Sequence, residues 1–581
     1  MRYILITVCT FVMTSLLIAP TLSAYLLGLH GIVSPLEMTL FFNQSGIAYY
    51  LLSVLLIALT ITIAVLYLKT GIYRYYSMLI VIGIVVISAG TTIGQLIFMF
   101  WQHVTMPNLN PLFVLAIYHH LSIYLQKYYL ISLIAGNAIV LLALFALKKE
   151  NYNLLGDAHF ASPIEMYKAG YFNKGGIVIG EAWGSKLYVG GFEHVLGFAP
   201  TGSGKTTSIA IPNLLSWQGS CIANDVKKTL WDKTKQFRQE TLGQQCYLWA
   251  PTDDETHCYN PLDLISHDTA NIVADCQRLS HILAPVDAKG EILWGQQARQ
   301  LLVALLLYVL QASNETKTLG RINALLKQND FDEWLATQAE VTGLHEVFYQ
   351  NAYAYLNQPD KTRGSTLTTL TGHFEIFGDP KVNHATSKTD FNIKVLRTTP
   401  MTIYIGIPPS DLARLSPLIT LFWEQVIHTM LSRLPDKNEQ VPVLCLLDEF
   451  GALKRMDILR QGLKLLREYR VRCVLLVQQL SQLREHYTRD EAESFLSIKT
   501  KIAFTPDSLE DAEYISKLLG NKTVRIKAGS TSTHEKGGST TKSYNYQSVP
   551  LMPAQKVMRM NGEEMLIIKA CYITVKALKL F

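Results

Sequence analysis

The sequence predicts an α/β domain with parallel strands, interrupted by an all-α insert and preceded by four N-terminal transmembrane helices. Three observations predict this class: four long apolar segments in the first 150 residues, a strand–loop–helix pattern around a glycine-rich loop at 199–206, and a helical stretch without strand patterns between about 270 and 355. The expected divisions are a transmembrane domain at 1–150, the first part of the α/β domain at 151–271, the insert at 272–355 and the second part at 356–581.

Composition separates the first 150 residues from the rest of the chain. Hydrophobic residues make up 49% of the 581 residues and charged residues 17%, which is apolar for a soluble protein. The first 150 residues hold six Lys or Arg and two acids, so they carry +4 of the total +6 and leave +2 for 151–581. This balance excludes a globally basic protein, and any nucleic-acid contact must come from a local basic surface.

The cysteines indicate a reducing environment. None of the eight forms a CxxC pair or a metal-ligand spacing with histidine, and Cys445 and Cys473 lie inside apolar strand patterns. Free cysteines in such positions behave as small hydrophobic residues. Buried, reduced thiols are expected for a domain in the cytoplasm.

Four apolar segments are long enough to cross a bilayer, at about 3–27, 48–68, 78–101 and 129–147. Lys69 and Arg74 lie in the second connecting loop, and Lys148 and Lys149 follow the fourth segment. The first connecting loop has no Lys or Arg. Because positive residues stay on the cytoplasmic side, the N-terminus, the second loop and everything after 148 are expected in the cytoplasm.

The α/β pattern begins after residue 151. Short strands are expected at 175–180 and 187–197, and a helix at 207–215 follows the glycine-rich loop. Further strands are expected at 219–225, which ends in Asp225, and at 245–250. After the insert, strands are expected at 401–407, 441–447 and 472–478, with a helix at 457–469 that makes the last two a parallel βαβ unit.

The glycine-rich loop fits a phosphate-binding P-loop, with Ala199 where the pattern has its first Gly. Gly202 and Gly204 allow a backbone nest whose N–H groups face phosphate oxygens. Lys205 would contact the β- and γ-phosphates, and the Thr206 hydroxyl would ligate Mg²⁺. An ordinary Gly/Ser turn is the alternative for the motif alone. The predicted nucleotide-binding residues are Thr201, Gly202, Ser203, Gly204, Lys205, Thr206 and Thr207.

A second motif, Val443–Glu449, is an apolar strand that ends in two carboxylates, which is the Walker B form. Asp448 would hold Mg²⁺, since a hard cation prefers oxygen ligands. Glu449 would polarise the attacking water, and Lys205 would act with it in catalysis. Together with the P-loop the pattern predicts an ATPase that uses ATP and Mg²⁺.

Two further catalytic positions are predicted with their alternatives. Gln478 ends the neighbouring strand and is suited to sense the γ-phosphate, or it is an ordinary surface residue at a strand end. Arg467 is a candidate arginine finger for a neighbouring subunit, with a solvated helix charge equally favoured and Arg363 as a rival. Segment 528–546 is rich in Ser, Thr, Gly and Lys, which favours a mobile surface loop over a DNA-contacting loop.

The motifs together resemble the type IV coupling proteins, the TraG/TraD-type ATPases of conjugation and type IV secretion. The stretches that carry the resemblance are the early apolar segments, 156–161, the P-loop followed by 211–215, 260–262, 448–451, 467–470, 478–483, 512–516 and 518–520. Four membrane segments exceed the two of many members, and no long acidic tail follows the core.

The resemblance implies a RecA-like motor, anchored in the bacterial inner membrane by several spans with its ATPase domain in the cytoplasm. It implies a homohexamer that receives single-stranded DNA with its relaxase, or secreted proteins, and passes them to components of a type IV secretion channel. The helical insert would face the substrate. The alternatives are a coupling ATPase dedicated to protein effectors and an FtsK-like DNA translocase; a membrane scaffold with an inactive P-loop is the non-enzyme alternative.

Overall fold

The computed structural model describes residues 154–580 apart from 267, 287–291, 454, 535–536 and 571–573, together with 93, 97, 127, 131–132 and 134–139. The four expected membrane segments therefore lie outside the described residues, except for a few positions in the third and fourth. Among the helices that the structure does describe, none combines the length and the hydropathy that a bilayer crossing requires.

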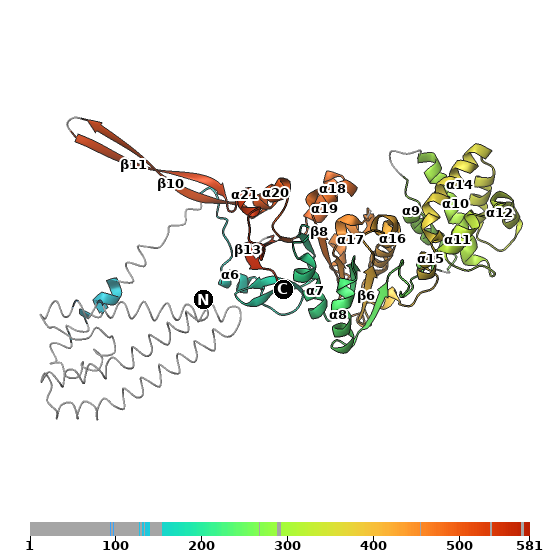
Figure 1. Ribbon diagram of the computed structural model, residues 1–581, viewed down its shortest axis with the longest axis horizontal. Helices are drawn as coiled ribbons and strands as arrows, with labels where there is room; N and C mark the ends of the chain where they lie inside the picture. The colour runs from blue at the N-terminus through green and yellow to red at the C-terminus, as the bar shows by residue number, and fades with distance from the viewer. Residues whose placement is uncertain are drawn as a thin grey trace, which may run out of the picture.

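Eleven described strands form one sheet in the order β2-β1-β13-β12-β9-β3-β8-β7-β4-β6-β5 (Figure 1). The strands from β9 to β5 are parallel, and β12, β13, β1 and β2 extend the sheet in antiparallel fashion. The bounds are β1 Ile177–Ala182, β2 Ser185–Val189, β3 Val195–Phe198, β4 Ser220–Asp225, β5 Gln245–Trp249, β6 Met401–Gly406, β7 Val443–Leu447, β8 Val471–Val477, β9 Thr500–Ala503, β12 Glu564–Lys569 and β13 Val575–Leu578.

The parallel strands read as continuous apolar runs because both faces of the sheet are covered. In β7, for example, Val443 and Cys445 belong to one core and Leu444 and Leu446 to the other. One face carries π-helix η2 Thr206–Ala210 with α7 Ile211–Ser216 and α8 Thr229–Glu240, and the other carries α16 Leu412–Leu431, α17 Asp457–Leu466 and α19 Arg489–Leu496. The other described α-helices of this domain are α6 Pro163–Lys168, α18 Leu480–His486, α20 Leu509–Leu519 and α21 Ala554–Val557.

The insert is a cluster of helices at one end of the molecule, far from β10 and β11 (Figure 1). Helix α10 lies at its centre: it is buried on every side from Leu301 to Leu310 and packs against α9, α13 and α14. The described helices are α9 Ile272–Leu283, α10 Ile292–Gln311, α11 Leu319–Leu326, α12 Phe331–Glu340, α13 Glu346–Leu356, α14 Asp360–Phe374 and α15 Pro380–Ala385.

The helices continue well beyond residue 355, so the expected end of the insert is too early. Helix α14 packs on α10, and strand structure returns only at β6. The sequence of α14 is rich in Thr and has few apolar residues, with Leu370 and Phe374 buried. Because so few apolar residues lie on the buried face of α14, its sequence shows little helical periodicity.

Two other expectations are corrected. The strand expected at 187–197 is two strands, β2 and β3, separated at Gly190 and Gly191. The loop expected at 528–546 belongs to a two-stranded antiparallel ribbon, β10 Asn521–His534 paired with β11 Gly537–Pro550, which projects from the domain (Figure 1). The ribbon forms a separate sheet. Its backbone pairing does not require an apolar face, which explains why the period-2 pattern is missing.

Candidate nucleotide-binding site

The candidate site lies where neighbouring parallel strands end. The P-loop follows β3, Asp448 and Glu449 follow β7, and Gln478 follows β8. Since β3, β8, β7 and β4 are adjacent and parallel, their carboxyl ends meet at one edge of the sheet. Motifs more than 240 residues apart in sequence are thereby brought together.

The P-loop backbone has the conformation that its glycines allow. Gly202 has φ of 74° and Gly204 has φ of 84°, in the left-handed region that side chains disfavour. Ala199 does not have positive φ; it is buried, and its N–H donates to the Val477 carbonyl at 2.9 Å. The alanine therefore fits without strain, and the departure from the motif leaves the loop unchanged. The helical segment that begins at Thr206 directs its N-terminus toward the loop.

The lysine and the second carboxylate form a direct ion pair. Lys205 Nζ lies 2.5 Å from Glu449 Oε1, and both groups are largely shielded from solvent. Gln478 Nε2 donates to the other oxygen of Glu449 at 3.0 Å, while Thr201 Oγ1 donates to Gln478 Oε1 at 2.9 Å. These side chains form one hydrogen-bonded chain from the P-loop to β8.

Asp448 and Thr206 form the second contact across the site. Thr206 Oγ1 donates to Asp448 Oδ2 at 2.7 Å, whereas the buried Oδ1 of Asp448 has no hydrogen-bond partner. Burial raises the pKa of Asp448, and the Lys205 ammonium and the Thr206 hydroxyl oppose this shift. A hydroxyl beside a carboxylate with a free lone pair fits Mg²⁺, which takes few protein ligands and completes its shell with phosphate and water. The described residues contain no group of three or more His, Cys, Asp or Glu suited to a metal.

Asp225, at the end of β4, is a residue that sequence reasoning did not assign to the site. It is 2% exposed, its carboxylate accepts from the Trp231 N–H at 2.7 Å, and burial raises its pKa to about 6, with a smaller contribution from Asp448. The available signal was a strand that ends in a carboxylate beside the Walker B strand. Only the strand order shows that the two are neighbours.

The two arginine candidates lie elsewhere. Arg467 caps the C-terminal end of α17, just before β8 begins, so it lies at the opposite edge of the sheet from Gln478 and is exposed. Arg363 lies in α14 of the insert, where it pairs with Asp332 at 3.0 Å and Asp360 at 2.7 Å. Neither arginine therefore lies near the P-loop of its own chain.

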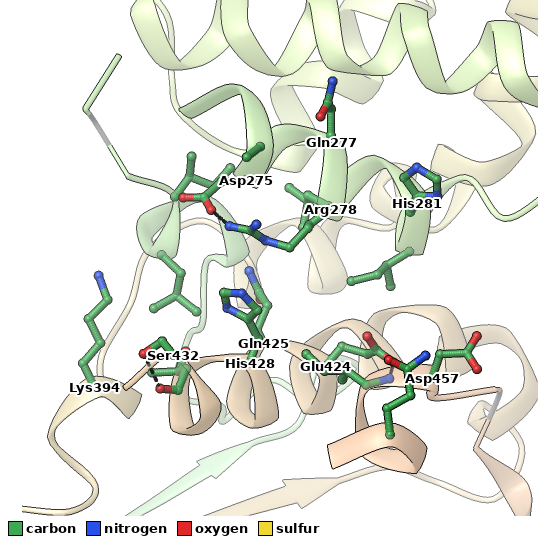
Figure 2. Close-up of a pocket in the computed structure, with 18 of the residues that line it drawn as sticks. Asp275, Gln277, Arg278, His281, Lys394, Glu424, Gln425, His428, Ser432 and Asp457 are labelled. Carbon is green, nitrogen blue, oxygen red and sulfur yellow. Dashed lines mark hydrogen bonds and ion pairs between the residues drawn. The ribbon is translucent and has the colours of Figure 1, made fainter. Parts of the chain in front are cut away.

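A cavity of about 830 Å³ lies away from this site, between α9 of the insert and α16 and α17 of the sheet domain. Figure 2 shows Asp275, Arg278 and His281 on the α9 wall and Glu424 and His428 on the α16 wall. We refer to it as the insert cleft. The cleft has none of the P-loop or Walker B residues, so its size does not identify it as the nucleotide site.

Comparison with known proteins gives consistent results. The family profile described as type IV secretory system conjugative DNA transfer matches residues 159–581. The conjugal transfer protein TraG of Escherichia coli is 30% identical over 460 residues, covering 71% of this chain and 72% of TraG. Protein VirD4 of Agrobacterium fabrum is 31% identical over 417 residues, covering 69% of this chain and 61% of VirD4.

The fold is shared with solved structures of the coupling protein TrwB. The structure of TrwB in complex with sulphate superposes with a TM-score of 0.58 at 17% identity, covering 74% of this chain and 95% of that one. The structure of TrwB with ADP and Mg²⁺ has a TM-score of 0.54 at 16% identity, covering 73% and 94%. At these identities the likeness concerns the fold.

Proposed function

The chain belongs to the type IV secretory system conjugative DNA transfer family, and from this premise we propose that it is a membrane-anchored coupling ATPase that drives a relaxase–DNA complex, or protein substrates, into a type IV secretion channel. The observation that carries the proposal is the convergence of Lys205 with Glu449 and of Thr206 with Asp448. The class of cargo is inferred from the family, and the use of ATP as the energy source is inferred from the residues of the site.

The site residues divide the work of ATP hydrolysis. The nest at Thr201–Thr207 would hold the phosphates, with Lys205 on the β- and γ-phosphates. Mg²⁺ would be held by Thr206 and Asp448 and would neutralise phosphate charge. Glu449 would accept the proton of the attacking water, and Gln478 would orient it. TrwB, which has been solved with ADP and Mg²⁺, supports the same ligands here.

The Lys205–Glu449 ion pair gives nucleotide binding a direct effect on the catalytic carboxylate. Phosphate oxygens compete with Glu449 for the Lys205 ammonium, because both are anions within reach of one cation. Once Lys205 turns to phosphate, the bond from Gln478 is the one side-chain hydrogen bond among the described residues that Glu449 keeps, and its other oxygen is free to accept a proton. The pair thus keeps the base occupied until substrate arrives.

The remaining parts of the proposal concern assembly. Residues 1–150 would anchor the chain in the inner membrane by several spans, with the ATPase domain in the cytoplasm. The balance of +2 over 151–581 implies that a monomer binds DNA weakly and that a hexamer collects basic residues around a channel. DNA affinity should then fall steeply with salt.

Arg467 is proposed as the arginine finger that serves a neighbour. Its exposure and its place at the opposite sheet edge exclude it from the site of its own chain, so any contribution must come from the next subunit. Such a contribution in trans raises the hydrolysis rate by about 10³–10⁵-fold in other P-loop enzymes.

A mixing experiment on the full-length protein tests the ring and the finger together. Arg467→Ala and Glu449→Gln should each be nearly inactive alone, while mixed rings should regain part of the ATPase rate. Partial recovery is expected because an Arg467→Ala subunit keeps an intact site and receives a finger from its Glu449→Gln neighbour. Arg363→Ala is the matched control and should retain its rate. A rate per subunit that is independent of protein concentration and unchanged in Arg467→Ala would rule out a shared site.

The nature of the cargo is tested separately. In a donor cell that carries both a mobilisable plasmid and a tagged effector, Lys205→Ala should abolish relaxase–DNA transfer. Loss of effector export with plasmid transfer intact would instead support the effector-dedicated alternative, and loss of chromosome segregation alone would support the FtsK-like one.

A further inference from the structure

Lys579, near the C-terminal end of the described chain, contacts the P-loop although 376 residues separate it from Ser203. The sheet explains the encounter. Strand β12 is antiparallel to β9, and β13 is antiparallel to β12, so β13 runs parallel to β9 and β3. Strand β13 therefore ends at the same sheet edge as β3, and Lys579 follows it directly.

The Lys579 side chain is held by two groups. Its Nζ donates to the Ser203 carbonyl at 2.7 Å and lies 4.2 Å from the centroid of the Phe504 ring. Phe504 is fixed to the P-loop strand, since its N–H donates to the carbonyl of Phe198, the last residue of β3, at 2.9 Å. Lys579 is 6% exposed, so these contacts form inside the domain.

The contact with Ser203 determines which way one peptide unit of the P-loop faces. In a trans peptide the carbonyl and the following N–H point in opposite directions. Because the Ser203 carbonyl is turned toward Lys579, the Gly204 N–H is turned away from it. In a phosphate-binding nest this N–H must face the interior of the loop. Lys579 therefore stabilises the orientation that phosphate binding requires.

The charge of Lys579 also lacks a partner of opposite sign. Among the residues that the structure describes, no carboxylate lies within ion-pair distance of Nζ, and burial lowers the pKa of the ammonium. One carbonyl and one aromatic ring offset only part of the cost of burying a cation. A buried positive charge beside a phosphate-binding loop favours an anion, and the triphosphate is the anion that this loop takes.

We propose that Lys579 is a positioning residue of the nucleotide site, which fixes the Ser203–Gly204 peptide unit and adds positive charge for the triphosphate. The inference rests on the proposed ATPase function and adds the C-terminal strand to the site. It also implies that a displacement of β12 and β13 would shift Lys579 and thereby change the conformation of the P-loop.

Steady-state ATPase measurements on the full-length protein test this role. Lys579→Met should raise KM for ATP about tenfold, the equivalent of one charge-assisted hydrogen bond, and leave kcat within twofold. Lys579→Arg should restore most of the affinity. Lys576→Met is the matched control: Lys576 lies on the same strand but is exposed and pairs with Glu564 at 2.8 Å, so its loss should not change KM.

The pH dependence of KM gives a readout that a merely structural role would not produce. As pH rises through the lowered pKa of Lys579, the wild type should lose affinity for ATP, whereas Lys579→Arg keeps the charge at this position and should lose less affinity over the same range. This comparison decides the question even if Lys579→Met fails to fold. Identical alkaline profiles, or an unchanged KM in folded Lys579→Met, would overturn the inference. A wild type without ATPase activity would instead reject the proposed function.

Discussion

The nucleotide site and the insert cleft each hold a carboxyl group that is shielded from solvent, buried for Asp448 and half-buried for Glu424, but only Asp448 has a cation beside it. At the nucleotide site, Asp448 accepts from Thr206 and lies near Lys205, and Glu449 pairs with Lys205. In the cleft, Glu424 accepts from backbone N–H groups at the start of α17, that of Ile458 at 3.4 Å and that of Asp457, and burial raises its pKa to about 7.

The pKa shifts of the two cleft histidines favour their neutral forms. Burial and Arg278 lower the pKa of His428, and burial and Arg299 lower that of His281. At the nucleotide site, the lysine that phosphate is proposed to contact is paired with a carboxylate. In the cleft, Glu424 has no cation beside it, and its pKa of about 7 lies near neutral pH. Both halves of the contrast can be tested.

The largest effect is expected from breaking the paired site. Glu449→Gln should reduce hydrolysis by about 10²–10⁴-fold because the general base is lost. It should leave nucleotide affinity equal or higher, since Lys205 no longer has a competing carboxylate. Lys205→Ala should abolish binding instead. Titration with a fluorescent ATP analogue measures nucleotide binding, and a phosphate-release assay measures hydrolysis, so the two variants can be distinguished. Normal turnover in Glu449→Gln would refute the assignment of Glu449 as the general base.

A smaller effect is expected from the hydrogen bonds that hold Glu449. Gln478→Ala removes the contacts to Glu449 and Thr201 and should lower kcat about tenfold, with little change in nucleotide affinity. Gln236→Ala, at an exposed position on α8, serves as the control. An unchanged kcat would mean that the contact between Gln478 and Glu449 is not used during turnover.

The smallest effect is expected in the cleft, as a change in stability. Because the folded pKa of Glu424 is raised to about 7, its favourable contribution is complete below the unfolded pKa of about 4.3 and is lost as pH rises through 7. Glu424→Gln should therefore raise the apparent melting temperature by about 2–4 °C at pH 8 and by less at pH 5.

Differential scanning fluorimetry across pH measures this change, with the exposed Glu468→Gln as control. Equal shifts at pH 5 and pH 8 would show that Glu424 is ionised in the folded protein throughout. In that case the contrast between the paired carboxylates of the nucleotide site and Glu424 would no longer hold.

The central elements could be predicted because their signals are local. The observed bounds differ by at most three residues from the expected ones for four strands, β4, β6, β7 and β8, and for α17, the helix between β7 and β8. The P-loop and Walker B motifs imply a shared site because strand ends in a parallel sheet meet at one edge. The structure brings Lys205, Thr206, Asp448, Glu449 and Gln478 together, and their catalytic roles remain predictions for the experiments above.

The missed features have few local signals. Helix α14 is polar enough to hide its periodicity, and the β10–β11 ribbon is stabilised by pairing of backbones and not by an apolar face. The role of Glu424 could not be predicted, because a single glutamate in an amphipathic helix normally faces water. Its pKa depends on burial and on the first residues of α17, which come from another part of the chain.

The sequence by itself predicted the residues of the nucleotide site and the central strands and helices, since side-chain period, glycine freedom and strand-end carboxylates act over a few residues. Only the tertiary structure decided that Asp225 lies beside Asp448, that Arg467 faces away from its own site, and that Lys579 holds the P-loop. The physical reason is that strand order and burial result from contacts between distant segments. The entropy of closing those loops and the packing that offsets it are properties of the whole chain.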